Sequence, residues 1–338
     1  MKAVQFSRFG DGHEVVDFVD VPEPTPPEPG EILIEILAAP INPSDFLNFR
    51  GLFGAVPPAL PAMAGGEAVG TVAALGAGID HLKIGDRVLA LWGGRGNWCQ
   101  KIKASAEGVA PLPAEADILQ LAMMAVNPAT AWHMLNSFVK LQPGEWVLQN
   151  AGNSAVGHNV AAIAKSMGLR TVNLVRREDQ IGPLLAAGAD AAIVDGPDLV
   201  GRVRSAVENA PIRLAFDAVA GDATARLGSC LARSGTIVIY GLLSGGDSVV
   251  HASDIVFRDI AVRGFWFTHW FESAAATERN KLYEQIGRLI AEGTIKVDIE
   301  GVYPMEKVKD ALLHAARAGR TGKVLLLPNP HLTSHFVK

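Results

Sequence analysis

Short apolar runs separated by turn residues dominate the first part of the chain. These runs are rich in Val and Ile and are bounded by Gly, Pro or Asp: Lys2–Phe6, Glu14–Val21, Glu31–Pro40, Gly66–Gly76 and Gly85–Trp92. Such spacing, with few helical patterns between the runs, is typical of the strands of a barrel or sandwich. We therefore predict a β-rich domain here.

The pattern changes near Ala122, where strands and helices begin to alternate. Helices such as Val156–Met167 and Ala223–Ala232 separate five predicted apolar strands: Trp146–Asn150, Thr171–Val175, Ala191–Val194, Leu214–Ala218 and Thr236–Tyr240. These strands do not alternate apolar with polar positions, as expected when both faces of a sheet are covered. The pattern predicts βαβ units that form a doubly wound parallel sheet, and hence an α/β fold.

The last part of the chain returns to a mixed pattern. It predicts a strand at Ile260–Phe267, helices at Glu278–Glu292 and Lys307–Ala318, and a closing strand at Lys323–Pro328. We expect the remaining residues, from Asn329 to Lys338, to be frayed.

The composition excludes several classes of protein. Of the 338 residues 49% are hydrophobic, and the formal net charge is −5 without a basic stripe, so we expect no nucleic-acid partner. No apolar run reaches the roughly 18 residues that span a bilayer, so we expect no membrane segment. The first residues lack the apolar region of a signal peptide, and Cys99 and Cys230 have no metal-binding spacing. These features predict a cytoplasmic protein with two reduced thiols.

A glycine-containing turn follows the first strand of the alternating region. Gly152 and Gly157 stand at its ends, and Ser154 occupies the place of the middle glycine of a dinucleotide fingerprint. Gly152 permits a tight turn, Gly157 allows close helix packing, and Ser154 is small and carries a hydroxyl. The helix N-terminus offers N–H groups to a pyrophosphate, so this strand–turn–helix–strand context predicts a dinucleotide site.

The second strand of this region ends in two arginines, Arg176 and Arg177, where an acid would bind the ribose of NAD. A guanidinium can bind a 2′-phosphate through two hydrogen bonds, whereas a carboxylate would repel it. The sequence therefore predicts NADPH as the cofactor. The alternative is a solvated basic pair that faces Glu178 and Asp179.

Five stretches carry a family resemblance: Asn42–Asp45, Asn127–Leu135, Leu141–Gly157, Leu169–Arg177 and Gly264–Trp270. They resemble the medium-chain dehydrogenase/reductase superfamily, and within it the zinc-independent trans-2-enoyl thioester reductases of the mitochondrial type. The NADPH:quinone oxidoreductases are the next most similar group. The resemblance implies a GroES-like catalytic domain at 1–122, a Rossmann NADP-binding domain at 123–265 and a return segment of the catalytic domain at 266–338.

The resemblance also implies the residues that contact the cofactor. They are Asn127, Thr130, Gly152, Asn153, Ser154, Ala155, Val156, Gly157, Arg176, Arg177, Tyr240, Gly241, Leu242, Leu243, Phe265, Trp266, Phe267 and Lys323. The alternative for the three aromatic residues at 265–267 is a role in the core, and the alternative for Tyr240 is simply the end of a buried strand.

Zinc-dependent members of the superfamily bind their metal through Cys, His and a further Cys or Asp. In this chain Ile41–Asp45 stands where the first cysteine would be, and Gly65–Glu67 stands where Gly-His-Glu would supply the histidine. Asp45 and Glu67 alone make a poor tetrahedral zinc site. We expect no metal, and therefore no direct oxidation of alcohols.

The activity implied is hydride transfer from NADPH to the β carbon of an activated double bond, in a 2-enoyl thioester or an enone. Such a site needs a donor for the developing enolate oxygen and a proton source. Phe53 occupies the position of the family's tyrosine and has no hydroxyl, so the other catalytic candidates are Asn42, whose amide can orient the substrate or the nicotinamide, and Trp270, which like His133 and His269 is a donor candidate by position only. The alternatives are an NADPH:quinone reductase and a non-catalytic NADPH-binding sensor. We also expect a homodimer through the apolar edge strand at Ile260–Phe267.

Overall fold

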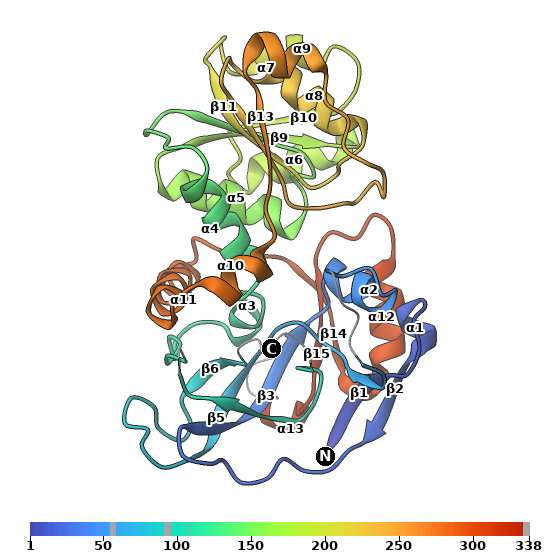
Figure 1. Ribbon diagram of the computed structural model, residues 1–338, viewed down its shortest axis with the longest axis vertical. Coiled ribbons are helices and arrows are strands. Elements are labelled where there is room, and N and C mark those ends of the chain that lie inside the picture. Colours follow the sequence, from blue (N-terminus) through green and yellow to red (C-terminus); the bar gives the residue numbers. More distant parts are fainter. Residues whose placement is uncertain (55–58, 91–95, 108, 334–338) are drawn as a thin grey trace. The chain divides into compact units, whose positions relative to one another are not determined.

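The computed structural model describes residues 1–54, 59–90, 96–107 and 109–333. It divides into two compact units (Figure 1). Unit 1 comprises Met1–Val126 and Phe271–Lys338, and unit 2 comprises Asn127–Trp270. The sequence predicted domain boundaries after residues 122 and 265. Each lies a few residues before the corresponding boundary between the units, which follow Val126 and Trp270.

Unit 1 is built mainly from antiparallel strands. Its described strands are β1 (Lys2–Phe6), β2 (Val16–Asp20), β3 (Glu31–Pro40), β4 (Ala62–Met63), β5 (Ala68–Leu75), β6 (Arg87–Ala90), β7 (Lys101–Ser105), β14 (Ile299–Pro304) and β15 (Lys323–Leu327). One sheet has the order β2-β1-β4; in the other, β14-β15-β3-β5-β6, strand β7 also pairs with β3. Strand β15 pairs with β3, so the return segment completes a sheet that the first part of the chain begins.

Unit 1 also contains helices, most of them short. They are α1 (Gly12–Val15), α2 (Pro43–Phe49), α3 (Ile118–Ala122), α11 (Ala276–Ala291), α12 (Val308–Ala316), α13 (Pro330–Thr333) and a 3₁₀ turn at Met305–Lys307. The core between sheets and helices contains Phe6, Phe49, Trp98 and a set of Val, Ile and Leu side chains. The ring of Phe49 lies 5.3 Å from that of Phe6 in an edge-on arrangement, typical of packed aromatic pairs.

Unit 2 is a doubly wound parallel sheet. Its strands are β8 (Trp146–Gln149), β9 (Arg170–Val175), β10 (Ala191–Val194), β11 (Ile212–Asp217), β12 (Thr236–Ile239) and β13 (Ala261–Gly264), in the order β10-β9-β8-β11-β12-β13. The order reverses direction next to β8, and such a switch point is where α/β sheets bind ligands.

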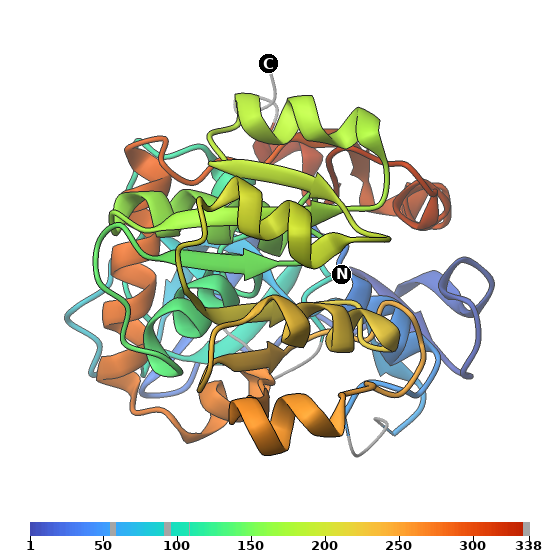
Figure 2. The same ribbon diagram turned by 90° about the horizontal axis from the view of Figure 1, so that it is seen from above.

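Helices cover both faces of this sheet (Figures 1 and 2). They are α4 (Asn127–Ser137), α5 (Ala155–Ser166), α6 (Ile181–Ala186), α7 (Leu199–Ala206), α8 (Asp222–Cys230), α9 (Ala252–Arg258) and a 3₁₀ turn at Glu178–Gln180. Helices α4 and α5 pack together, as do α7 and α8. Right-handed crossovers put α5 and α6 on one face and α7 and α8 on the other.

Two sequence predictions about the last part of the chain were wrong. The predicted strand Ile260–Phe267 ends at Gly264, and Phe267 begins α10 (Phe267–Ser273). Asn329–Lys338 was expected to be frayed, but Asn329 is buried and donates from its amide to the carbonyls of Ile36 and Gln100, and α13 follows. These hydrogen bonds attach the segment to the sheet of unit 1. Residues 334–338 lie outside the described residues.

Candidate active site

The glycine turn connects β8 to α5 as predicted, but its left-handed backbone conformation is not at a glycine. The left-handed residue is Ala151, with φ of +48°. Gly152 is required because a Cβ there would lie 2.7 Å from the Cβ of Asn173 on β9. A Cβ on Gly157 would lie 2.4 Å from the carbonyl oxygen of Gly152, so the backbone of the turn leaves no space for a side chain at Gly157. The two glycines keep the turn compact where a pyrophosphate would bind.

Ser154 caps the helix that follows this turn. Its Oγ accepts a hydrogen bond of 3.0 Å from the N–H of Gly157, in an N-cap geometry. The N–H groups of Ala155 and Val156 lie in the first turn of α5, where helical N–H groups have no partner within the helix. Asn153 precedes Ser154 on the half-buried turn. The start of α5 can therefore donate backbone hydrogen bonds to an anion.

The two arginines at the end of β9 differ in their surroundings. Arg177 donates through Nε to Asp179 at 3.1 Å. For Arg176, which is exposed, the described part of the chain provides no hydrogen bond or ion pair. Both line a hollow of about 660 Å³ together with Arg202 of α7 and Glu178. The hollow carries a net positive charge and lies beside the end of β9, as expected for a phosphate subsite.

The strand β12 leads into the other predicted cofactor segment. The half-buried Tyr240 lies at its end, and its hydroxyl is buried with no hydrogen-bond partner among the described residues. Burial raises the pKa of this hydroxyl, and neighbouring Ser154 offsets part of the rise. A Cβ on Gly241 would meet the Ala218 carbonyl oxygen at 2.6 Å, whereas Leu242 and Leu243 are exposed. An orphaned hydroxyl beside a glycine turn fits a polar ligand such as a dinucleotide.

The predicted aromatic residues lie partly in a cluster within unit 2. The imidazole of His133 on α4 lies 3.9 Å from the ring of Trp270 and about 6 Å from those of Phe265 and Phe267. Phe267 is buried, whereas Trp266 is exposed by 44%. Phe265 and Phe267 therefore pack among other rings, the alternative that the sequence left open. Asn127 and Thr130 lie one turn apart on α4, and both are buried.

A network of four buried polar side chains is the main feature of unit 1. Asn42 precedes α2, Asp45 lies in its first turn, Glu67 precedes β5 and Lys323 begins β15. The Nδ2 of Asn42 donates to Glu67 Oε1 at 2.6 Å, and the ammonium of Lys323 donates to Asn42 Oδ1 and to the carbonyl of Ile41. The backbone N–H of Asn42 donates to Asp45 Oδ2 at 2.7 Å.

Burial shifts the pKa values of all three ionisable groups in this network. It raises the pKa of Asp45 to about 7, against the opposing effect of the Asn42 N–H. It raises the pKa of Glu67 as well, where Lys323 opposes the rise, and lowers the pKa of Lys323 to about 8. Two carboxylates face one ammonium, and burial raises the pKa of both carboxyl groups, so the network can take up a proton near neutral pH.

Phe53, at the predicted catalytic position, is half-buried in the loop after α2. Phe49, at the end of α2, is wholly buried between Phe6 and Trp98, so it belongs to the core. The sequence did not indicate that Lys323, expected at the cofactor, is bonded to Asn42.

The donor set of unit 1 does not fit a zinc ion. The described residues contain no group of three or more His, Cys, Asp or Glu side chains that could hold a metal. Where a histidine would stand, Gly66 faces Asp45, and the ammonium of Lys323 occupies the other side of Asn42. A buried cation of the protein's own competes with a metal ion for the same carboxylate charge.

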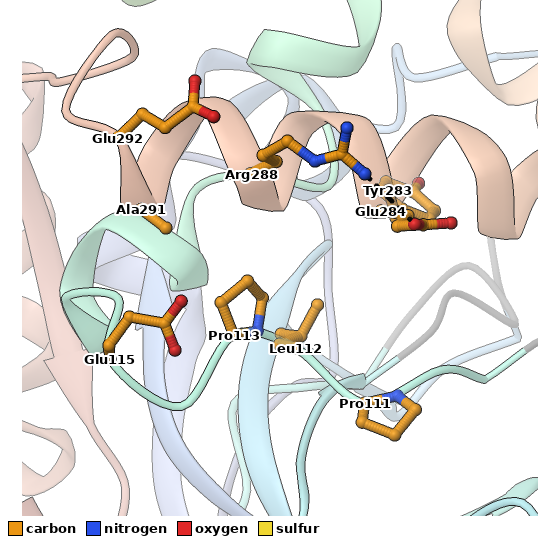
Figure 3. Close-up of a pocket in the computed structure, with 9 residues that line it drawn as sticks. All are labelled: Pro111, Leu112, Pro113, Glu115, Tyr283, Glu284, Arg288, Ala291 and Glu292. Atoms are coloured by element: carbon orange, nitrogen blue, oxygen red, sulfur yellow. Dashed lines mark hydrogen bonds and ion pairs between the residues drawn. The ribbon is translucent and has the colours of Figure 1, made fainter.

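Unit 1 also contains a hollow of about 560 Å³ between α11 and the segment 111–115 (Figure 3). Pro111, Leu112 and Pro113 lie on one side, opposite Arg288, which pairs with Glu284 at 3.4 Å. No residue predicted for catalysis or cofactor binding lines this hollow. In the helices of the described part of the chain, we find none that is both long and apolar enough to cross a membrane.

Comparison with known proteins decides the family. The model of the alcohol dehydrogenase GroES-like domain matches residues 28–114, and that of the zinc-binding dehydrogenases matches residues 155–292. The mitochondrial enoyl-[acyl-carrier-protein] reductase of Rattus norvegicus is 33% identical over 317 residues, which cover 92% of this chain and 84% of the relative. The chain belongs to the medium-chain dehydrogenase/reductase superfamily.

Solved structures agree with this assignment. A candidate NADPH:quinone reductase from Bacillus thuringiensis is 29% identical, with a TM-score of 0.88, and the match covers 96% of this chain and 98% of that one. The quinone oxidoreductase of Escherichia coli, solved with NADPH, is 28% identical with a TM-score of 0.86, and the match covers 97% and 100%. The predicted α/β fold, with its GroES-like domain and Rossmann sheet, is confirmed, and this medium-chain dehydrogenase/reductase is an oxidoreductase.

Proposed function

We propose that this chain is an NADPH-dependent reductase that transfers hydride to the β carbon of an activated double bond, in a 2-enoyl thioester or an enone. The observation that carries the proposal is the exposed guanidinium of Arg176, placed beside the glycine turn and without a partner among the described residues. The E. coli relative was solved with NADPH, and the rat relative is named an enoyl-[acyl-carrier-protein] reductase.

The residues of unit 2 supply what a dinucleotide needs. The first turn of α5, with Ala155 and Val156, presents N–H groups to the pyrophosphate, and Arg176 binds the 2′-phosphate. Tyr240 provides a buried hydroxyl. NADPH, when bound, supplies a hydride, and the substrate's carbonyl oxygen then gains negative charge as its β carbon is reduced. The α carbon takes a proton to complete the reaction.

In unit 1, Asn42 is the residue that we propose to contact the reacting groups. Its amide can donate a hydrogen bond to an oxygen that gains charge, which lowers the barrier when the donor is held in place beforehand. Phe53 cannot replace the family's tyrosine in this role, because it has no hydroxyl. Losing such a donor typically costs a factor of roughly 10² or more in rate, so we expect slow turnover of enoyl thioesters.

A second candidate function, NADPH:quinone reductase, is favoured by Phe53. A quinone accepts hydride without a positioned acid, because its reduced form is already stabilised by resonance. The E. coli relative is named a quinone oxidoreductase. A non-catalytic NADPH sensor would bind the cofactor and reduce neither class of acceptor.

One assay separates these functions. NADPH oxidation is followed by its absorbance with a 2-enoyl thioester, a short enone and a quinone, each against a blank without acceptor. We expect turnover with the enone and, more slowly, with the thioester. Turnover with the quinone alone supports the second function, and NADPH binding without turnover supports the sensor.

We also propose a homodimer formed through the edge of the unit 2 sheet. Strand β13 pairs only with β12 among the described strands, so its other edge is open. On the preceding helix α9, Val256 and Phe257 are exposed by 70% and 75%. Open edges and exposed apolar side chains are usually covered by a partner. We expect Phe257→Asp to lower the mass in analytical ultracentrifugation from dimer to monomer; a monomeric wild type would refute the proposal.

Cys99 and Cys230 are free buried thiols, which fits a reducing compartment such as the cytoplasm, and we propose this location. Cell fractionation tests it, because recovery of the protein in an oxidising compartment would contradict the proposal.

A further inference from the structure

The carboxylate of Glu67 connects two segments that the proposed function uses. One oxygen, Oε1, accepts the side-chain N–H of Asn42 at 2.6 Å, and the other, Oε2, accepts the backbone N–H of Val126 at 2.9 Å. Val126 is the residue before Asn127, which begins α4 and is a predicted cofactor contact. A single buried carboxylate thus fixes both a candidate catalytic amide and the backbone that leads to a candidate cofactor residue.

The amide of Asn42 is held from both ends. Its nitrogen donates to Glu67, and its oxygen accepts from the ammonium of Lys323. This pattern allows only one of the two amide orientations, because a flipped amide would set NH₂ against the ammonium and oxygen against the carboxylate. A cation on the carbonyl oxygen also draws electron density from the nitrogen, which makes the N–H groups stronger donors.

Burying this network costs folding free energy, because its charged side chains lose their hydration. Glu67 is 1% exposed and Lys323 is 4% exposed. Apolar residues of similar volume at such positions commonly give a more stable protein than a buried ion pair. Hydrogen-bonded polar networks of this kind are instead suited to holding one side chain in one geometry.

We propose that Glu67 is a positioning residue for the reduction, which fixes the Asn42 amide and the backbone before Asn127, with Lys323 as the cation that sets the direction of the amide. The proposal rests on the proposed function for the role of Asn42.

Glu67→Gln tests the proposal with almost no change of shape. Glutamine has one acceptor oxygen, so its NH₂ must face either the Asn42 amide N–H or the Val126 N–H, and one of the two bonds is lost. We expect kcat to fall by roughly 10–100-fold while the Kd for NADPH changes by less than about 3-fold. Glu145→Gln is the matched control, because Glu145, like Glu67, accepts a backbone N–H with one oxygen and a side-chain N–H, that of Arg213, with the other. We expect its kcat to equal that of the wild type.

The double variant Glu67→Gln/Asn42→Asp separates positioning from folding. In it the NH₂ of residue 67 can donate to the new carboxylate, its oxygen can accept from Val126, and Lys323 keeps an acceptor. The melting temperature should return toward that of the wild type, while kcat stays low because the amide donor is absent. Recovery of kcat in the double variant, or an unchanged kcat in Glu67→Gln, would overturn the proposal.

A measurement without turnover decides the same point. The Asn42 side-chain amide is the ¹⁵N NMR signal that disappears in Asn42→Asp. We expect its protons to exchange slowly in the wild type and faster in Glu67→Gln, and identical exchange in the two would refute the positioning role. Wild type that oxidises NADPH with none of the acceptors would refute the proposed function, and the NMR comparison would still decide on Glu67.

Discussion

Replacing Arg176 with alanine is the perturbation that bears most directly on cofactor choice. The guanidinium is exposed, and the described residues offer it no partner, so its full charge is available to a 2′-phosphate. A hydrogen bond to a charged group contributes about 1.5–3 kcal/mol, and exposure to solvent favours the lower part of this range. A loss of about 1.5–2 kcal/mol corresponds to a roughly 10–30-fold rise in KM for NADPH. NADH lacks this phosphate, so its KM should be nearly unchanged.

The variant Arg177→Ala provides a comparison, because Arg177 lines the same hollow as Arg176. Its Nε is already bonded to Asp179 at 3.1 Å, so part of its charge is neutralised. We expect Arg177→Ala to raise the KM for NADPH by less than about 5-fold. Arg204→Ala, which removes an exposed charge from α7 outside the hollow, is the control and should have almost no effect. Initial rates at fixed ionic strength measure all three variants. Equal effects of Arg176→Ala on NADPH and NADH, or a larger effect at Arg177, would refute the reasoning.

Three other single substitutions have definite expected outcomes. Phe53→Tyr should raise kcat/KM for a 2-enoyl thioester above that of the wild type, and steady-state assays without any gain would argue against a catalytic position there. Asp45 has a folded pKa of about 7, above its unfolded value, so the folded protein binds the proton of this carboxyl more tightly than the unfolded chain does. The resulting stability is fully present below pH ~4 and is lost as the pH rises toward 7. The stability advantage of the wild type over Asp45→Asn, measured by urea unfolding, should therefore shrink by about 2 kcal/mol between pH ~4.5 and ~6.5, and a constant difference would contradict the raised pKa. Gly157→Ala places a Cβ 2.4 Å from the Gly152 carbonyl oxygen and should cost about 1–3 kcal/mol in urea unfolding, with weaker NADPH binding; an unaffected variant would show that the turn can move.

The parallel sheet could be predicted because its strands are buried on both faces. A short apolar run that leads into a glycine turn, as Trp146–Leu148 leads into the turn at Gly152, has few other interpretations. Periodicity failed at Ile260–Phe267, since an apolar run does not reveal where a strand ends and a buried helix begins. It also missed the short strand β7, whose residues Lys101–Ser105 are mostly polar and half-buried.

The nucleotide turn was predicted from its glycines, although for an incomplete reason. The pattern assigns to Gly152 the conformational freedom of a tight turn, but the left-handed residue is Ala151, and Gly152 is needed because Asn173 lies against it. The distance between two strands decides such a requirement, and a single sequence does not contain it.

The network around Glu67 could not be foreseen from residue types. Asn42 and Lys323 are far apart in the chain, and Lys and Glu are usually exposed. Pairing of β15 with β3 brings Lys323 to Asn42, so the contact depends on the topology of the return segment. A weak signal was present, because Glu67 is the only charged residue in the run Ala62–Leu75.

The most direct test of the proposed reduction follows the hydride itself. Protein dialysed against a chelator is incubated with [4-²H]NADPH, in either stereochemical form, and a short enone or 2-enoyl thioester, and the product is examined by mass spectrometry and NMR. We predict a saturated product with one deuterium at the β carbon from one of the two forms. Unchanged alkene from both forms, or activity that returns only with stoichiometric zinc, would contradict the account.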